Sequence, residues 1–349
     1  MSAARPGLAS VLLLGVCAAA ARSAPVDPGE RVREINFAVD DNLKAGPIIP
    51  RKTATDLLAD LTDLLAKTPL DKFNPIQQAR VLKAQTYCRL SLGDAEQARA
   101  AARQWTKIEP DTLAAWEAVH ECALALGDKV ESLNSYRTYL KVGRFAWVTK
   151  GKKPPDLSAM SADEVDKFLN SPEQEAARER IVDMLAKRFG SVGRDIPAVL
   201  VVGPGGKKTF EWKKNTGKAL VIAVWNSGEA ASSQLVLDAY RELYKLHGEG
   251  GRAAFLALNG PADVTERRRE TEAMAKEALP GGSHQEVLSK PGGLYQRQLN
   301  QPPFPVLVVI GADGRSRYAG GPAKVTLRQA AFALAACLRE AGEDTGGGK

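Results

Sequence analysis

Two stretches of this 349-residue chain repeat each other at a spacing of 34 residues. Cys88 is followed 34 positions later by Cys122, and Leu-Gly-Asp at 92–94 recurs at 126–128. Each glycine lies between two runs with helical hydrophobic spacing, and Pro110 interrupts the chain just before the second copy. A single helix pair of this kind cannot bury its apolar face alone, so such repeats stack on one another. The spacing therefore predicts an array of helix–turn–helix units.

This segment resembles the tetratricopeptide repeat family, whose pattern is followed by Pro110, Trp116, Leu126, Gly127 and Tyr136. It departs from the family at Trp105 and Tyr139, where a small residue is expected late in the second helix. We expect the array to cover residues 50–145 and to begin with a leucine-striped helix over 52–66. The predicted fold class is therefore α followed by α/β, with this helical array first.

Residues 146–193 are predicted to be a lysine- and proline-rich linker and a connecting helix. That helix should run over 171–189, with Ser171 as its cap, Pro172 in its first turn and Gln174 three residues after the cap. From residue 194 to 340 the pattern changes to strands alternating with helices, and we expect this part to fold on its own. The tail, 341–349, is predicted to be disordered.

The elements expected in the second part follow from hydrophobic runs and turn residues. They are a short apolar run over 196–202, a hairpin over 203–212, a buried strand over 218–225, a helix over 230–246, a strand over 253–258, a polar helix over 262–278, strands over 304–310 and 316–320, and a closing amphipathic helix over 326–338.

The order and spacing of these elements resemble the thioredoxin-like fold, in the exported TlpA- and ResA-like branch. The run "GKALVIAVW" is similar to the strand that precedes that family's active site, and "PVLVVIGADG" is similar to its proline, strand and turn. The resemblance implies that Pro305 is the cis-proline beside the active site, whereas the residues alone allow either isomer.

The resemblance also shows what this sequence lacks. The family's two cysteines would fall at Glu229 and Ser232, counted from Trp225, and its proton-handling residue would fall at Ala223. Neither a carboxylate nor a hydroxyl can replace the thiolate that disulfide exchange requires. Trp225, Glu229, Ser232 and Pro305 are therefore predicted to be a degenerate site, and no catalytic residue is assigned.

Two interpretations of this site stay open. Glu229 can be a residue suited to the first turn of a helix, where the dipole favours a negative charge, on a site that has decayed. Alternatively, Glu229 and Pro305 can border a retained peptide-binding surface. The predicted function is thus a redox-inactive protein-binding or scaffolding module. The rival hypothesis is a thiol-disulfide enzyme that uses Cys337 or a thiol supplied by a partner.

The cysteines and histidines predict neither a disulfide framework nor a metal site. Cys88, Cys122 and Cys337 are widely spaced without a CxxC pair, and we expect all three to be buried. The three histidines, His120, His247 and His284, share no metal-ligand spacing, so no metal or other cofactor is predicted.

The beginning of the chain looks like an export signal over residues 1–24, with Arg5 before an apolar run and small residues suited to cleavage. Cleavage can follow Ala19-x-Ala21 or Ala21-x-Ser23. Val16 is too bulky before Cys17 for a lipoprotein signal. We therefore expect a periplasmic or secreted protein of undetermined oligomeric state, whose mature chain has no stable membrane insertion.

Protein or peptide is the partner class that the composition allows. The net charge of +7 is divided among short clusters of lysine and arginine rather than concentrated in one stripe. Nucleic-acid binding requires such a stripe with stacking aromatic residues, so this class is not predicted.

Overall fold

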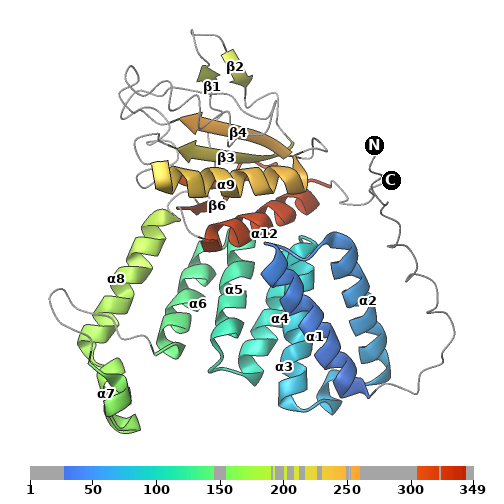
Figure 1. Cartoon of the computed structure of the whole chain (residues 1–349), viewed down its shortest axis with the longest axis vertical. Helices are drawn as coiled ribbons and strands as arrows, with labels where there is room; N and C mark the ends of the chain where they lie inside the picture. The colour runs from blue at the N-terminus through green and yellow to red at the C-terminus, as the bar shows by residue number, and fades with distance from the viewer. Residues whose placement is uncertain are drawn as a thin grey trace, which may run out of the picture.

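Figure 1 shows the computed structural model of the chain. The residues that it describes are 27–144, 155–189, 192, 200–202, 208–211, 217–225, 230–248, 251, 253–259, 305–321 and 324–342. The predicted signal segment, the polar helix predicted over 262–278, Glu229 and residues 343–349 lie outside these ranges.

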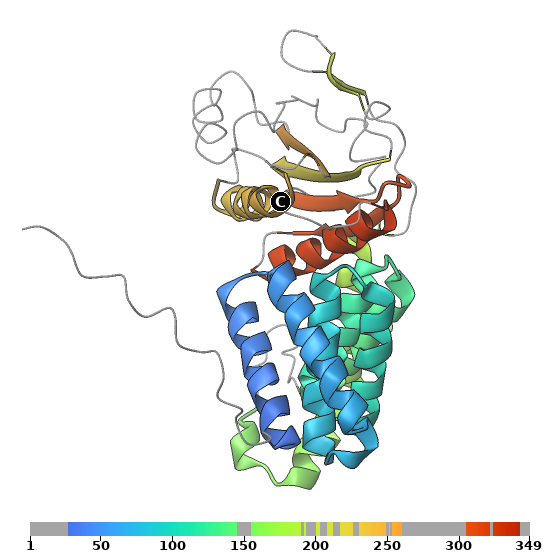
Figure 2. The same ribbon diagram turned by 90° about the vertical axis from the view of Figure 1, so that its right-hand side faces the viewer.

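Helices stacked side by side form the N-terminal half (Figures 1 and 2). They are α1 (Pro28–Ala45), α2 (Arg51–Lys67), the 3-10 turn η1 (Leu70–Lys72), α3 (Pro75–Ser91), α4 (Ala95–Ile108), α5 (Leu113–Ala125) and α6 (Lys129–Val142). The predicted helix–turn–helix pairs are present as α3–α4 and α5–α6. Their turns contain Gly93 and Gly127, whose φ angles of 77° and 70° lie in the left-handed region that favours glycine.

Local sequence explains where some of these helices begin. Asn74 and Gln77 form a reciprocal capping box at the start of α3, and Pro75 occupies the first turn. The leucine-striped helix predicted over 52–66 is α2. The preceding helix α1 was not predicted, although Val32, Ile35 and Val39 are spaced for one buried face.

After the array come η2 (Leu157–Ala159), α7 (Ala162–Leu169) and α8 (Pro172–Arg188). The prediction of a helix over 171–189 is confirmed by α8, with Ser171 at the N-cap position and Pro172 in the first turn as predicted. The Ser171 side chain makes no capping hydrogen bond, however, and Gln174 is buried. Helix α8 is joined to α6 by Arg137, which donates hydrogen bonds to both carboxylate oxygens of Glu179.

A four-stranded mixed sheet forms the centre of the second half. Strand β3 (Ala219–Trp225) pairs in parallel with β4 (Ala253–Asn259) and antiparallel with β5 (Val306–Ile310), and β5 pairs antiparallel with β6 (Ser316–Gly320). A separate antiparallel pair joins β1 (Leu200–Val202), which lies in the predicted apolar run, to β2 (Lys208–Glu211), which lies in the stretch predicted as a hairpin by itself. All of β3 is buried, as expected for a strand covered on both faces.

Helices α9 (Ala230–His247) and α12 (Lys324–Glu340) pack on this sheet and contact each other. Helix α12 lies between the sheet and the ends of the array helices, as both views show (Figures 1 and 2). The helix predicted over 326–338 is present as α12, but the expectation of an exposed polar face fails over 330–338, where every residue is buried. Leu334 and Leu338 belong to the core under the sheet, whereas Phe332 and Ala336 belong to the core of the array.

The two halves of the described structure therefore share one helix. Separated from residues 27–144, the second half would expose the Phe332 side of α12 to water. Residues 194–340 were expected to fold on their own, and that expectation did not take into account that α12 also packs against the array. The domain boundaries stay a prediction.

The repeated Leu-Gly-Asp turns lie at this junction. A Cβ atom on Gly93 would be 2.3 Å from the backbone oxygen of Ala335 in α12, so the α3–α4 turn touches that helix directly. A Cβ atom on Gly127 would be 3.3 Å from Cδ of Arg317 in β6. Asp94, beside Gly93, pairs with Arg339 of α12 at 3.6 Å. The motif that defines the repeat thus also forms the contact between the halves.

Candidate functional site

The residues predicted to form a degenerate site gather at one end of the sheet, as far as the structure describes them. Trp225 ends β3 and is fully buried, and Pro305 directly precedes β5 and is also buried. Val224 and Val306 are register partners, so Trp225 and Pro305 extend neighbouring antiparallel strands. Ser232 lies in the first turn of α9 and is partly exposed. Glu229 lies outside the described residues.

The indole Nε1 of Trp225 is buried and has no hydrogen-bond partner among the described residues. A buried donor without a partner costs about 1–3 kcal/mol. The described contacts of the Trp225 ring are therefore those of the apolar core at this end of the sheet.

No thiol of the described residues lies at this end of the sheet. Cys88 in α3, Cys122 in α5 and Cys337 in α12 are all buried and free. Burial raises the pKa of Cys88 and of Cys337 to about 12 and the pKa of Cys122 well above its usual range. Because a thiolate is the reactive form, burial and a raised pKa disfavour reaction at these three groups in the folded chain.

A buried ion-pair cluster lies at the junction of the two halves, and the sequence analysis did not identify it. Arg328 of α12 donates from Nε to Glu121 Oε1 at 2.8 Å and from Nη2 to Glu117 Oε1 at 2.9 Å. The side chain of Glu121 is fully buried, and by distance and angle its Oε2 has no hydrogen-bond partner among the described residues. The one sequence signal for this cluster was a glutamate inside the apolar run of α5.

Glu121 and its neighbour His120 have pKa values displaced in opposite directions. Burial raises the pKa of Glu121 to about 7, against the attraction of Arg328, and Glu117 raises it further. Burial lowers the pKa of His120 to about 4, against a hydrogen bond to the Ser132 backbone oxygen at 3.0 Å. Both groups therefore favour their neutral forms in the folded chain.

These displacements predict pH effects on stability that oppose each other. Glu121 has a folded pKa above its ordinary 4.5, so its contribution is complete below pH 4.5 and is lost as the pH rises to about 7. His120 has a folded pKa below its ordinary 6.5, so its contribution is complete above pH 6.5 and is lost as the pH falls to about 4.

We expect Glu121→Gln to become more stable relative to wild type as the pH rises from 4.5 to 7, by on the order of 3 kcal/mol. His120→Gln should become less stable relative to wild type over the same interval, by a similar amount. Urea unfolding at several pH values measures both slopes. Two variants with the wild-type slope would contradict the buried, neutral state of these side chains.

Other candidate sites are not supported by the part of the chain that the structure describes. There, no group of three histidine, cysteine, aspartate or glutamate residues is placed to hold a metal ion. No described helix is both long enough and apolar enough to cross a membrane.

Neither a family model nor a curated protein matches this sequence. Among solved structures, the thioredoxin domain of a Bacteroides vulgatus thiol-disulfide oxidoreductase is 12% identical, with a TM-score of 0.32 over 39% of this chain and 91% of that one. A secreted disulfide oxidoreductase of Mycobacterium tuberculosis is 15% identical, with a TM-score of 0.31 over 40% and 96%. A thioredoxin-family thiol:disulfide interchange protein of Chlorobium tepidum is 14% identical, with a TM-score of 0.31 over 41% and 95%. All three likenesses are distant in sequence and in shape.

Proposed function

We propose that this chain is an exported protein-binding module, in which a thioredoxin-like domain without thiol-disulfide activity is fixed on a tetratricopeptide-like helical array. The observation that carries the proposal is the burial of Cys88, Cys122 and Cys337, each with its pKa raised. Disulfide exchange needs an accessible thiolate, and these thiols offer none. Glu229 and Ser232 stand in the sequence where a redox pair would be.

The arrangement of the second half supports a thioredoxin-like domain. A parallel β3–β4 pair is followed by the antiparallel strands β5 and β6 and by a closing helix, in the order that the sequence resemblance implies. Trp225 and Pro305 extend adjacent strands at the end where α9 begins. In this proposal that end receives an extended segment of a protein partner.

The shared helix supports a scaffolding role. Because α12 is buried against both the sheet and the array, the end of the sheet that contains Trp225 and Pro305 is held in one orientation relative to the array helices. The signal-like segment at 1–24 supports action outside the cytoplasm, in the envelope or beyond it.

Thiol titration of the native protein tests the absence of redox chemistry. We expect Cys88, Cys122 and Cys337 to be unreactive toward an aromatic disulfide reagent until urea is added, and reduction of insulin disulfides to stay at background. Ser232→Cys is the matched positive control. A partly exposed thiol in the first turn of α9 should react readily, because the helix N-terminus lowers its pKa.

A native wild-type thiol that reacts as fast as the Ser232→Cys thiol, together with turnover of insulin, would refute the proposal. It would favour the enzyme hypothesis that uses Cys337 or another thiol of the chain.

A further inference from the structure

The outer surface of the array contains a groove lined by α4, α5 and α6. It lies between α4 and α6, which are the second helices of the two pairs. It has a volume of about 650 Å³ and includes Thr106 and Lys107 from α4, Trp116 and Val119 from α5, and Val130 from α6. The Val130 side chain is 71% exposed, although it is apolar. A groove of this size fits one or two side chains of a bound segment.

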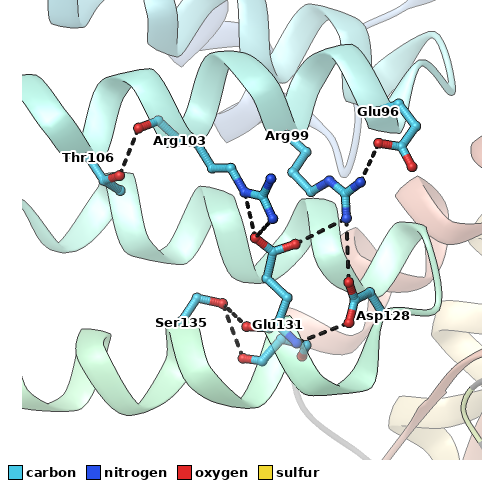
Figure 3. A network of polar contacts seen from close by, with 8 residues as sticks. Glu96, Arg99, Arg103, Thr106, Asp128, Glu131 and Ser135 are labelled. Atoms are coloured by element: carbon cyan, nitrogen blue, oxygen red, sulfur yellow. Dashed lines mark hydrogen bonds and ion pairs between the residues drawn. The ribbon is translucent and has the colours of Figure 1, made fainter.

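The acidic groups of the groove are already neutralised (Figure 3). Glu131 accepts hydrogen bonds from Arg99 at 3.1 Å and from Arg103 Nε at 2.7 Å. Asp128 caps α6 by accepting from the backbone N–H of Glu131, and it also pairs with Arg99 at 3.4 Å. These carboxylates therefore have little capacity left for a cationic ligand.

The hydroxyl groups around the groove are also occupied. Thr106 donates to the backbone oxygen of Arg103, Thr138 to that of Asn134 and Ser135 to that of Glu131. The Trp116 indole donates to the backbone oxygen of Pro110 at 2.8 Å, which fixes the ring and leaves its faces for packing. Packing of an apolar ligand group in the groove is thus available from methyl groups and from the faces of this ring.

One charge of the lining is not compensated. Lys107 is exposed and forms no ion pair with any described residue, whereas Arg103 is paired with Glu131. An apolar surface beside a cation without a partner is complementary to a ligand in which an apolar side chain lies close to a carboxylate.

We propose that the α4–α6 groove binds a segment of a partner protein in which apolar side chains alternate with aspartate or glutamate. An apolar side chain packs against Trp116 and Val130, and a neighbouring carboxylate pairs with Lys107. The inference deepens the proposed binding function, on which it rests, but it uses the helical half and none of the residues at the sheet end.

Fluorescence anisotropy of the full chain with a labelled peptide of about ten residues tests this site. The probe contains leucine, phenylalanine, aspartate and glutamate, and has an amidated C-terminus. One control peptide replaces the acids with lysine, and another replaces the apolar residues with serine. We expect a Kd between about 1 and 100 µM for the first peptide, weakening with added salt, and at least about tenfold weaker binding of both controls.

Lys107→Glu and Val130→Asp should each weaken binding of the probe by at least about tenfold, because each places a negative charge in the groove. Val130 lies in the first turn of α6, where an acidic residue suits the helix dipole, so this variant should stay folded. Lys52→Glu is the matched control, since Lys52 is an exposed lysine of α2, far from the groove in sequence, and should bind like wild type.

Absence of probe binding, or binding that these two variants leave unchanged, would overturn the groove assignment. Either result would leave the proposed function standing, because the thiol test does not depend on this surface. Equal weakening by Lys52→Glu would show that net charge alone attracts the peptide, and it would also overturn the assignment.

Discussion

Gly93→Ala should destabilise the protein by about 3–5 kcal/mol, whereas Gly127→Ala should cost about 1–2 kcal/mol. Both glycines have left-handed φ angles, 77° and 70°, so both variants pay a similar backbone cost. They differ in what the new methyl group meets. At Gly93 it meets the backbone oxygen of Ala335 at 2.3 Å, and at Gly127 the flexible side chain of Arg317 at 3.3 Å. A backbone contact cannot yield without moving α12 away from the array.

The free energy of unfolding in urea measures this difference, and amide hydrogen exchange in α12 locates it. We expect faster exchange over residues 330–338 in Gly93→Ala than in Gly127→Ala. Equal losses of stability in the two variants would mean that the φ angle alone sets the cost, and that the α3–α4 turn does not hold α12 in place.

Arg328→Met should cost about 1–3 kcal/mol near neutral pH, because it removes the hydrogen bonds from Arg328 to Glu117 and Glu121 and leaves any ionised Glu121 buried without a cation. Arg328 lowers the pKa of Glu121, so its removal drives a proton onto Glu121 in the folded state. The loss should therefore be smaller at pH 5, where the carboxyl group is protonated more easily. Urea unfolding at the two pH values checks both parts of this prediction.

Two further variants separate the buried charge from the loss of an arginine. Glu121→Gln combined with Arg328→Met should recover more than half of the lost stability, since no buried charge then lacks its partner. Arg339→Met removes the more exposed pair with Asp94 and should cost less than about 1 kcal/mol. If Arg328→Met costs no more than Arg339→Met, the buried cluster does not stabilise the junction.

The elements of the sheet could be predicted because their signals are local. The run over 219–225 is apolar at every position, which is typical of a strand covered on both faces, and the turn at Gly314 separates β5 from β6. The burial of Cys88, Cys122 and Cys337 was also predicted, from their positions on apolar helical faces. Trp225 and Pro305 were assigned to one site by family resemblance, and their role as a binding surface stays a prediction.

The junction could not be predicted because its partners are far apart in the chain. Arg328 and Glu121 are 207 residues apart, and nothing near either residue indicates the other. The run "AAFALAACL" is apolar on most sides, so its sequence does not distinguish a helix with one buried face from a helix with two. Gly93 was recognised as a turn residue, but its contact with Ala335 depends on the docked position of α12.

The place of α12 in the chain also sets the order in which the molecule can fold. The array helices are synthesised first, but Phe332 and Ala336, which complete their core, come more than 200 residues after α5. Until residue 340 has left the ribosome, or has crossed the membrane if the chain is exported, α3 and α5 expose the surface that α12 will cover. The N-terminal half therefore exposes apolar surface for as long as the second half is being made, a condition that favours aggregation. Contacts between such distant residues also slow folding, so docking of α12 should be the late step.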